Sequence, residues 1–145
     1  MFERILVPVD GSEAALAALE YALELQNKFE SELLLLCVYR HYSLLEASLS
    51  MVRPEQPENL DESMREYATG VVENAKKAAA DHGSKKVRGF VKSGPPARTI
   101  VNFAKDKNAS LIVLGSRGLG DVEGYLLGSV SHKVTSLAHC PVLVV

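Results

Sequence analysis

Short, almost purely apolar runs recur along this 145-residue chain and constrain its fold more than any other feature. The clearest are Ile5–Val9, Leu33–Tyr39, Leu111–Leu114 and Val142–Val145. Runs of this length are typical of strands that are covered on both faces, as in a parallel sheet. A further run, Lys86–Lys92, mixes apolar with charged residues and therefore suits the edge of a sheet.

Helical patterns fill the gaps between these runs. We predict helices over Ala14–Lys28, over Asp61–His82, from Pro95-Pro96 onward, and over Ser129–His139. Ser12 is a plausible N-cap for the first helix, and Gly83 a stop after the second. The order β-α-β-α-β-α-β-α-β predicts a doubly wound α/β fold in a single domain, residues 1–145.

The segment Arg40–Leu60 is the one irregular stretch, and it is longer than most connections between elements. A short helix near Leu44–Met51 fits within it. A lid, a partner contact and a mobile insertion all remain open for this segment.

Composition narrows the class of protein. Hydrophobic residues make up 47% and charged residues 23%, which is ordinary for a globular domain. The net charge of −2 gives no electrostatic reason to bind nucleic acid or an anionic membrane. Cys37 and Cys140 lie far apart and suggest buried thiols in a reducing compartment. With no signal peptide and no apolar run near the ~20 residues that a membrane span needs, we expect a cytoplasmic protein.

The glycine-rich segment after the fourth run, residues 111–129, carries the strongest functional signal. Gly115 closes the run, Gly118 follows, and Gly128-Ser129 comes later. Glycines let a backbone approach an anion closely, and the N–H groups at a following helix start supply hydrogen-bond donors. The segment therefore predicts a phosphate-binding loop, with Ser129 facing a phosphate or capping the helix.

Further candidates lie where other predicted strands end. Ligands of open parallel sheets bind beyond the carboxyl ends of the strands, where the strand order reverses. If the first and fourth strands are neighbours, Asp10 and Gly115 face one crevice. Asp10 could then accept ribose hydroxyls or help to hold Mg²⁺, and Val38 could offer its backbone to the edge of an adenine.

The same residues also fit plain structural roles. Residues 10–12 are common turn residues, and taken alone they fit a turn that enters a helix. The glycines beyond Gly115 fit a flexible loop, and Gly128-Ser129 an ordinary helix start. Neither of the two common phosphate-binding motifs, G-x-x-x-x-G-K-[ST] and G-x-G-x-x-G after the first strand, is present.

Polar side chains near these glycines are equally open to two interpretations. Arg117 could pair with a phosphate or be solvated. Ser116 and Ser131 could touch a phosphate or satisfy nearby backbone groups.

These residues together resemble the universal stress protein family over essentially the whole chain. The opening ILVPVDGSE is similar to that family's first strand and turn. The segment GSRGLGDVEGYLLGSVSHKV resembles its G-x2-G-x9-G-[ST] signature, and CPVLVV its last strand. The resemblance implies an adenine-nucleotide α-hydrolase-like fold with strand order 3-2-1-4-5.

The resemblance also implies roles for single residues. It assigns Gly115, Gly118, Gly128 and Ser129 to phosphates, Asp10 to ribose or metal, and Pro8 and Val38 to the adenine. The predicted cofactor-binding residues are Pro8, Val9, Asp10, Val38, Leu114, Gly115, Ser116, Arg117, Gly118, Leu119, Gly120, Gly128, Ser129 and Val130. The implied ligand is ATP, or ADP or AMP, with Mg²⁺ held through the phosphates.

The implied assembly is a homodimer formed through Val142–Val145. An uncovered apolar edge strand invites pairing with another chain, and a second copy would cover it in a closed interface.

Three functions are consistent with these features. The first is an ATP-binding regulatory protein of the stress response, with at most slow ATP hydrolysis because no Walker lysine or recognisable base is present. The second is a nucleotide-independent dimeric interaction module. The third, an adenylylating or electron-transfer relative, normally carries further segments for which a chain of this length has little room.

Overall fold

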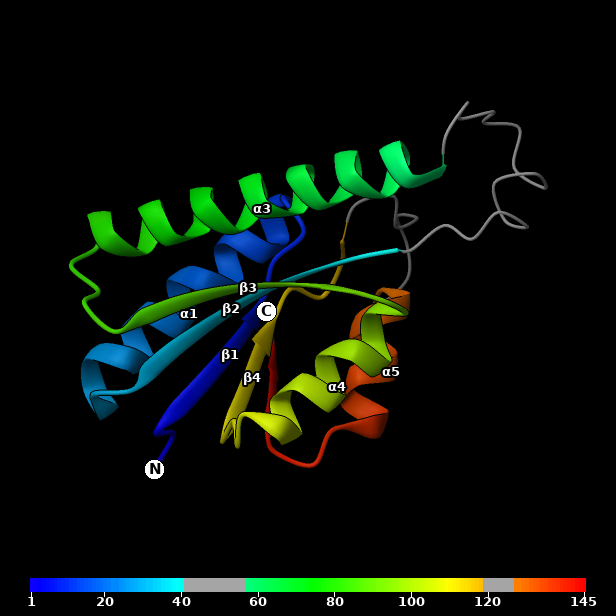
Figure 1. Cartoon of the computed structure of the whole chain (residues 1–145). Helices are drawn as coiled ribbons and strands as arrows, with labels where there is room; N and C mark the ends of the chain where they lie inside the picture. Colours follow the sequence, from blue (N-terminus) through cyan, green and yellow to red (C-terminus); the bar gives the residue numbers. More distant parts are fainter. Residues whose placement is uncertain (41–56, 119–126) are drawn as a thin grey trace.

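Strands and helices alternate in the computed structural model, which describes residues 1–40, 57–118 and 127–145 (Figure 1). The strands are β1 (Arg4–Pro8), β2 (Glu32–Tyr39), β3 (Val87–Ser93), β4 (Leu111–Leu114) and β5 (Val142–Val144). The helices are α1 (Glu13–Phe29), α3 (Pro57–Asp81), α4 (Pro96–Asp106) and α5 (Ser129–Leu137). The predicted order of elements is confirmed.

All the strands are parallel and form one sheet in the order β3-β2-β1-β4-β5. The order 3-2-1-4-5 implied by the family resemblance is therefore confirmed. β3 lies at one edge of the sheet, as its mixed composition predicted, and β5 lies at the other. β1 runs between β2 and β4, with Leu6 level with Leu34 and Ile112.

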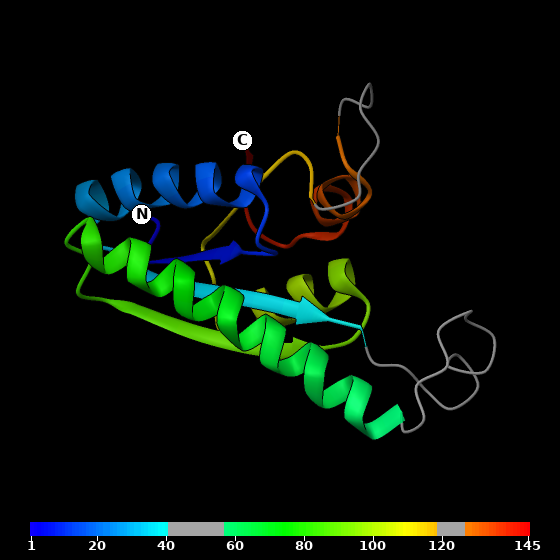
Figure 2. The same cartoon turned by 90° about the horizontal axis from the view of Figure 1, so that it is seen from above.

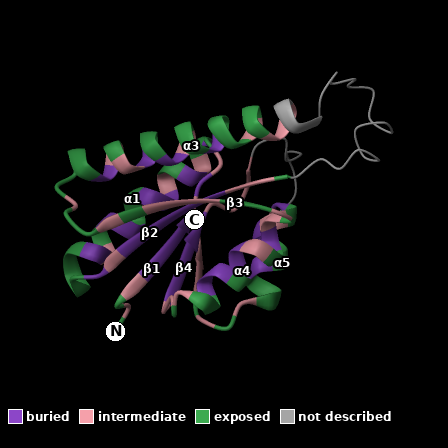
Figure 3. Cartoon of the chain, viewed as in Figure 1, coloured by how far each residue is buried: buried purple, intermediate pink, exposed green. Residues whose placement is uncertain are grey.

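Two apolar cores lie on the two faces of the sheet, because successive strand residues point to opposite faces. Ile5 and Val7 pack beneath α1 and α3, whereas Leu6 packs against α4 and α5. Figures 1 and 2 show the resulting three layers, in which α3 runs along β2 and β3. The central strands are buried and the outer helix faces exposed (Figure 3).

Local signals explain most helix ends. Ser12 is the N-cap of α1, because its Oγ accepts a hydrogen bond of 3.2 Å from the N–H of Ala15. Gly83 follows the end of α3 with a φ of +85°, a conformation that favours glycine, so the predicted stop is confirmed. α5 ends at Leu137 and not at His139, because the extended backbone of Ala138 breaks the helix before Pro141.

The end of the expected irregular segment is helical. α3 begins at Pro57, so the last residues of the expected Arg40–Leu60 connection are helical. A proline suits the first position of a helix, where its missing N–H removes no intrahelical bond. The suggested helix at Leu44–Met51 lies outside the described residues.

Both cysteines are free thiols, but they differ in exposure. Cys37 is buried in the core beneath α1, as predicted, whereas Cys140 is only half-buried. None of the described helices is both long enough and apolar enough to cross a membrane.

Candidate functional site

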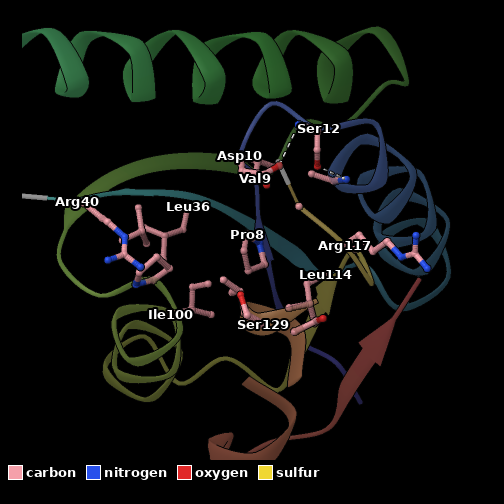
Figure 4. A pocket seen from close by; sticks show the side chains of 17 residues that line it. Pro8, Val9, Asp10, Ser12, Leu36, Arg40, Ile100, Leu114, Arg117 and Ser129 are labelled. Carbon is pink, nitrogen blue, oxygen red and sulfur yellow. Dashed lines mark hydrogen bonds between the residues drawn. The ribbon is translucent and has the colours of Figure 1, made fainter. Parts of the chain in front are cut away.

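A cavity of about 340 Å³ opens at the carboxyl ends of β1, β2 and β4 (Figure 4). Predicted residues that line it are Pro8, Val9, Asp10, Val38, Leu114, Gly115, Arg117, Gly118, Ser129 and Val130. The expected crevice is confirmed, because the neighbouring strands β1 and β4 bring Asp10 and Gly115 to the same opening. Of the other predicted residues, Ser116 and Gly128 do not line the cavity, and Leu119 and Gly120 lie outside the described part of the chain.

The cavity has further walls that the sequence did not indicate. They come from Ser12, Ala15, Leu36, Arg40, Pro96 and Ile100, whereas Ser131, which also lines the cavity, was one of the open phosphate candidates. Leu36 and Val38 lie on one face of β2, and Pro96 and Ile100 begin the helix opposite that face. Two-residue periodicity along β2 could have indicated Leu36, but the position of α4 follows only from the fold.

Asp10 closes the turn between β1 and α1 and also lines the cavity. Its Oδ1 accepts a hydrogen bond of 2.9 Å from the N–H of Ser12, so the structural interpretation of residues 10–12 holds. Ser12 in turn caps α1 (Figure 4). Because the turn fixes the Asp10 backbone at the cavity, the structural role also positions the carboxylate at the opening.

The negative charge of the Asp10 carboxylate affects the pKa of the buried thiol of Cys37. Burial, and to a lesser extent the negative charge of Asp10, raises the pKa of Cys37 to about 11. The thiol is therefore protonated at neutral pH, and a protonated thiol is a weak nucleophile and metal ligand. Cys37 packs in the core beneath α1 and is not among the residues that line the cavity.

Gly115 is required by packing at the end of β4. A Cβ added there would lie 2.7 Å from the Cβ of Ala14 and 2.9 Å from its carbonyl oxygen. Distances this short force the neighbouring backbone to move. The glycine lets the first turn of α1 approach β4, so its presence has a structural cause independent of any ligand.

Hydrogen bonds tie the start of α5 to the chain just after β4. The carbonyl oxygen of Ser116 accepts a bond of 2.6 Å from the N–H of Gly128, the residue before α5. The Ser131 Oγ lies 2.8 Å from the same oxygen and 3.0 Å from the carbonyl oxygen of Gly128. Of the two interpretations left open for Ser131, the structure shows the contacts with the local backbone.

Ser116 is also hydrogen-bonded to the residue that follows β5, the strand at one edge of the sheet. Its N–H donates a hydrogen bond of 2.7 Å to the carbonyl oxygen of Val145. Any contact between Ser116 and a ligand would thus use its side chain, because its N–H is already engaged.

The first turn of α5 presents hydrogen-bond donors to the cavity. The N–H of His132 donates to the carbonyl oxygen of Gly128 over 3.0 Å, so the helical pattern starts there. The N–H groups of Ser129 and Val130 precede that first bond, and both residues line the cavity. Free N–H groups and the positive end of the helix dipole both favour an anion at this place.

The described residues contain no cluster of three or more His, Cys, Asp or Glu side chains that could hold a metal ion. Asp10 is the acidic residue that lines the cavity. A divalent cation here would accordingly need ligands from a bound molecule, such as phosphate oxygens.

Known proteins match this chain over its whole length. The model of the universal stress protein family matches residues 1–145. Universal stress protein YxiE of Bacillus subtilis is 38% identical over an alignment that covers 100% of this chain and 99% of the relative. Universal stress protein MJ0531 of Methanocaldococcus jannaschii is 35% identical, with 100% of this chain and 82% of the relative covered.

The structural match is equally extensive. The solved structure of protein MJ0577 from Methanocaldococcus jannaschii superposes with a TM-score of 0.84 at 34% identity, covering 100% of this chain and 96% of that one. Sequence, strand order and overall structure agree, and the chain belongs to the universal stress protein family.

Proposed function

We propose that this protein binds an adenine nucleotide in the cavity and acts as a nucleotide-dependent regulatory protein of the stress response. The observation that carries the proposal is the first turn of α5. Its N–H groups and Ser129 line the same cavity as Arg117 and Gly118. This arrangement offers donors and positive charge to phosphates. The cavity volume of about 340 Å³ falls within the range of small-molecule sites.

The other half of the cavity suits a flat, apolar base. Pro8, Leu36 and Val38 form its sheet side, and Pro96 and Ile100 its helix side. Asp10 stands at the end of β1, between the base side and the phosphate side, where a ribose would lie. A carboxylate accepts hydrogen bonds from ribose hydroxyls, and it could share a Mg²⁺ ion with the phosphates.

Relatives of the same fold are known with adenine nucleotides. One solved universal stress protein is a complex with cAMP, and another, from Arabidopsis thaliana, has AMP bound. They share 24% and 23% identity with this chain and so indicate a common fold. The case for a nucleotide here therefore rests on the lining of the cavity, with ATP as the preferred candidate and ADP or AMP as alternatives.

The proposed assembly is a homodimer that pairs through β5. This strand lies at the edge of the sheet, and its residues are half-buried in the single chain. Hydrogen bonds from Ile112 to Pro141 and from Val145 to Leu114 direct the backbone groups of alternate residues toward β4. The backbone groups of Val142 and Val144 consequently face outward, where a second copy could pair with them.

The proposal is tested by asking what the purified protein carries and binds. We expect mass spectrometry of the denatured protein to detect an adenine nucleotide, and calorimetry with and without Mg²⁺ to show ATP binding. Gly128→Val should abolish binding and leave the dimer intact. Gly128 is buried at the helix start, with a φ of −69° that valine also adopts, so crowding is expected and backbone strain is not.

Gly70→Val is the matched control, because a Cβ at Gly70 meets nothing within 4 Å. Normal ATP binding by Gly128→Val would contradict the phosphate assignment. A wild-type protein that carries no nucleotide and binds none would favour the second candidate, a nucleotide-independent interaction module that works through the outward edge of β5.

A further inference from the structure

Arg40 lies on the side of the cavity away from the glycine-rich segment. It directly follows β2, whereas Arg117 follows β4, and β1 runs between those two strands. Neighbouring strands are about 4.8 Å apart, so the two arginines start from strand ends separated by roughly 10 Å. Figure 4 shows Arg40 on the side of Leu36 and Arg117 on the opposite side, with Pro8 between them.

The strand register makes Arg40 part of one continuous wall. Leu36 pairs with Pro8 at the end of β1, so β2 continues past its neighbour. Side chains two residues apart point to the same face of a strand, which places Leu36, Val38 and Arg40 in one row. All three line the cavity opposite Pro96 and Ile100 of α4. The row and the start of α4 enclose a slot. The inner part of the row, Leu36 and Val38, is apolar, and its outer end is the guanidinium group of Arg40.

Phosphate binding does not explain the position of the Arg40 guanidinium. The donors for an anion gather at the start of α5 and at Arg117, across the cavity from Arg40. Within the described parts of the chain, Arg40 forms no hydrogen bond or ion pair, and its side chain is exposed. The guanidinium therefore remains available to a ligand held in the slot.

We propose that Arg40 is a specificity-determining residue that stacks its guanidinium on the exposed face of a planar aromatic base. This inference rests on the proposed nucleotide site, and it adds the residue that covers the nucleobase in that site. A guanidinium is planar, weakly hydrated and attracted to the electron-rich face of an aromatic ring. With the apolar side chains of Val38 and Ile100 against the ring and Arg40 across the mouth, the slot selects nucleotides over sugar phosphates.

The experiment compares AMP with ribose 5-phosphate, which has the same phosphate and sugar but no base. Calorimetric titrations are made with the wild-type protein, Arg40→Ala and Arg40→Lys. We expect Arg40→Ala to weaken AMP binding by roughly threefold to tenfold and to leave ribose 5-phosphate binding unchanged. Arg40→Lys should also lose affinity for AMP, because an ammonium keeps the charge but lacks the planar face.

Arg98→Ala is the matched control, since Arg98 is an exposed arginine of α4 outside the cavity lining. Equal weakening of AMP and ribose 5-phosphate by Arg40→Ala would overturn the inference and place the guanidinium at the phosphate. Unchanged AMP binding would overturn it as well. A wild-type protein that binds neither AMP nor ATP would refute the nucleotide site itself, a result distinct from a failure confined to the Arg40 variants.

Discussion

The backbone N–H of Ser116 donates a hydrogen bond of 2.7 Å to the carbonyl oxygen of Val145, just past the end of β5. The carbonyl oxygen of the same serine accepts from Gly128 at the start of α5. One residue thus connects the edge of the sheet to the helix start that lines the cavity. A partner that pairs with β5 would act on a strand that shares hydrogen bonds with the candidate nucleotide site.

The hydroxyl of Ser131 strengthens this connection, and we expect Ser131→Ala to lower the free energy of unfolding by about 1 kcal/mol. The cost stays modest because the carbonyl oxygen of Ser116 keeps its bond from Gly128. Urea unfolding measures the change. Ser136→Ala, at an exposed serine of the same helix, is the control and should change stability by less than about 0.5 kcal/mol. Equal stability of the two variants would mean that Ser131 does not hold the helix start.

The packing role of Gly115 predicts that Gly115→Ala destabilises the protein even without nucleotide, by about 1–3 kcal/mol. The added Cβ would collide with Ala14 at the start of α1. Thermal and urea unfolding of nucleotide-free protein measure the effect. Gly70→Ala is the matched control in open space on α3, and it should increase stability by about 0.5–1 kcal/mol. An unchanged stability of Gly115→Ala would refute the steric role.

The buried thiol of Cys37 predicts a loss of stability in alkaline solution. Its pKa rises from 9.0 to about 11 in the folded protein, so between these values the unfolded chain has released a proton that the folded chain retains. The free energy of unfolding therefore falls as the pH rises from about 9 to about 11, by at most about 1.4 kcal/mol per pH unit.

Cys37→Ala isolates this effect from the other groups that titrate in the same range. The difference in unfolding free energy between wild type and Cys37→Ala should shrink across that pH window and level off above it. A difference that stays constant with pH would show that the folded protein does not hold the thiol in its protonated form.

The outward backbone groups of β5 predict that Val144→Pro breaks the proposed dimer and leaves the chain folded. Proline removes an N–H that faces away from β4, and edge strands tolerate proline at such positions. Light scattering coupled to size exclusion measures the mass, and circular dichroism the fold. Val144→Thr keeps both the N–H and the branched side chain and should remain dimeric. A dimer that survives Val144→Pro would exclude pairing through this edge.

Much of the fold could be predicted because its signals are local. The apolar run at Leu33–Tyr39 became β2 with one residue added, and Ser12 caps the helix that its position indicated. The predicted start of the second helix, Asp61, was wrong, because α3 begins at Pro57. A proline and polar neighbours are typical of a loop, but a proline is also favoured at the first position of a helix.

The candidate site was predictable in part for the same reason. Asp10 and Gly115 each follow an apolar run, so both were expected at strand ends. The side of the cavity formed by α4 was not predictable, because Pro96 and Ile100 reach it only through the packing of a helix on the sheet.

The sequence by itself determined the order of strands and helices, the N-cap at Ser12, the stop at Gly83, and the glycine-rich segment after β4, because periodicity and turn chemistry act between near neighbours in the chain. It did not determine the N-cap of α5, which is Gly128 and not Ser129. Only the tertiary structure decided that Gly115 makes room for Ala14, that Ser116 bonds Val145, and that Arg40 lines one side of the cavity. These contacts join residues far apart in sequence, and they depend on which strands are neighbours and on how far each extends past the next.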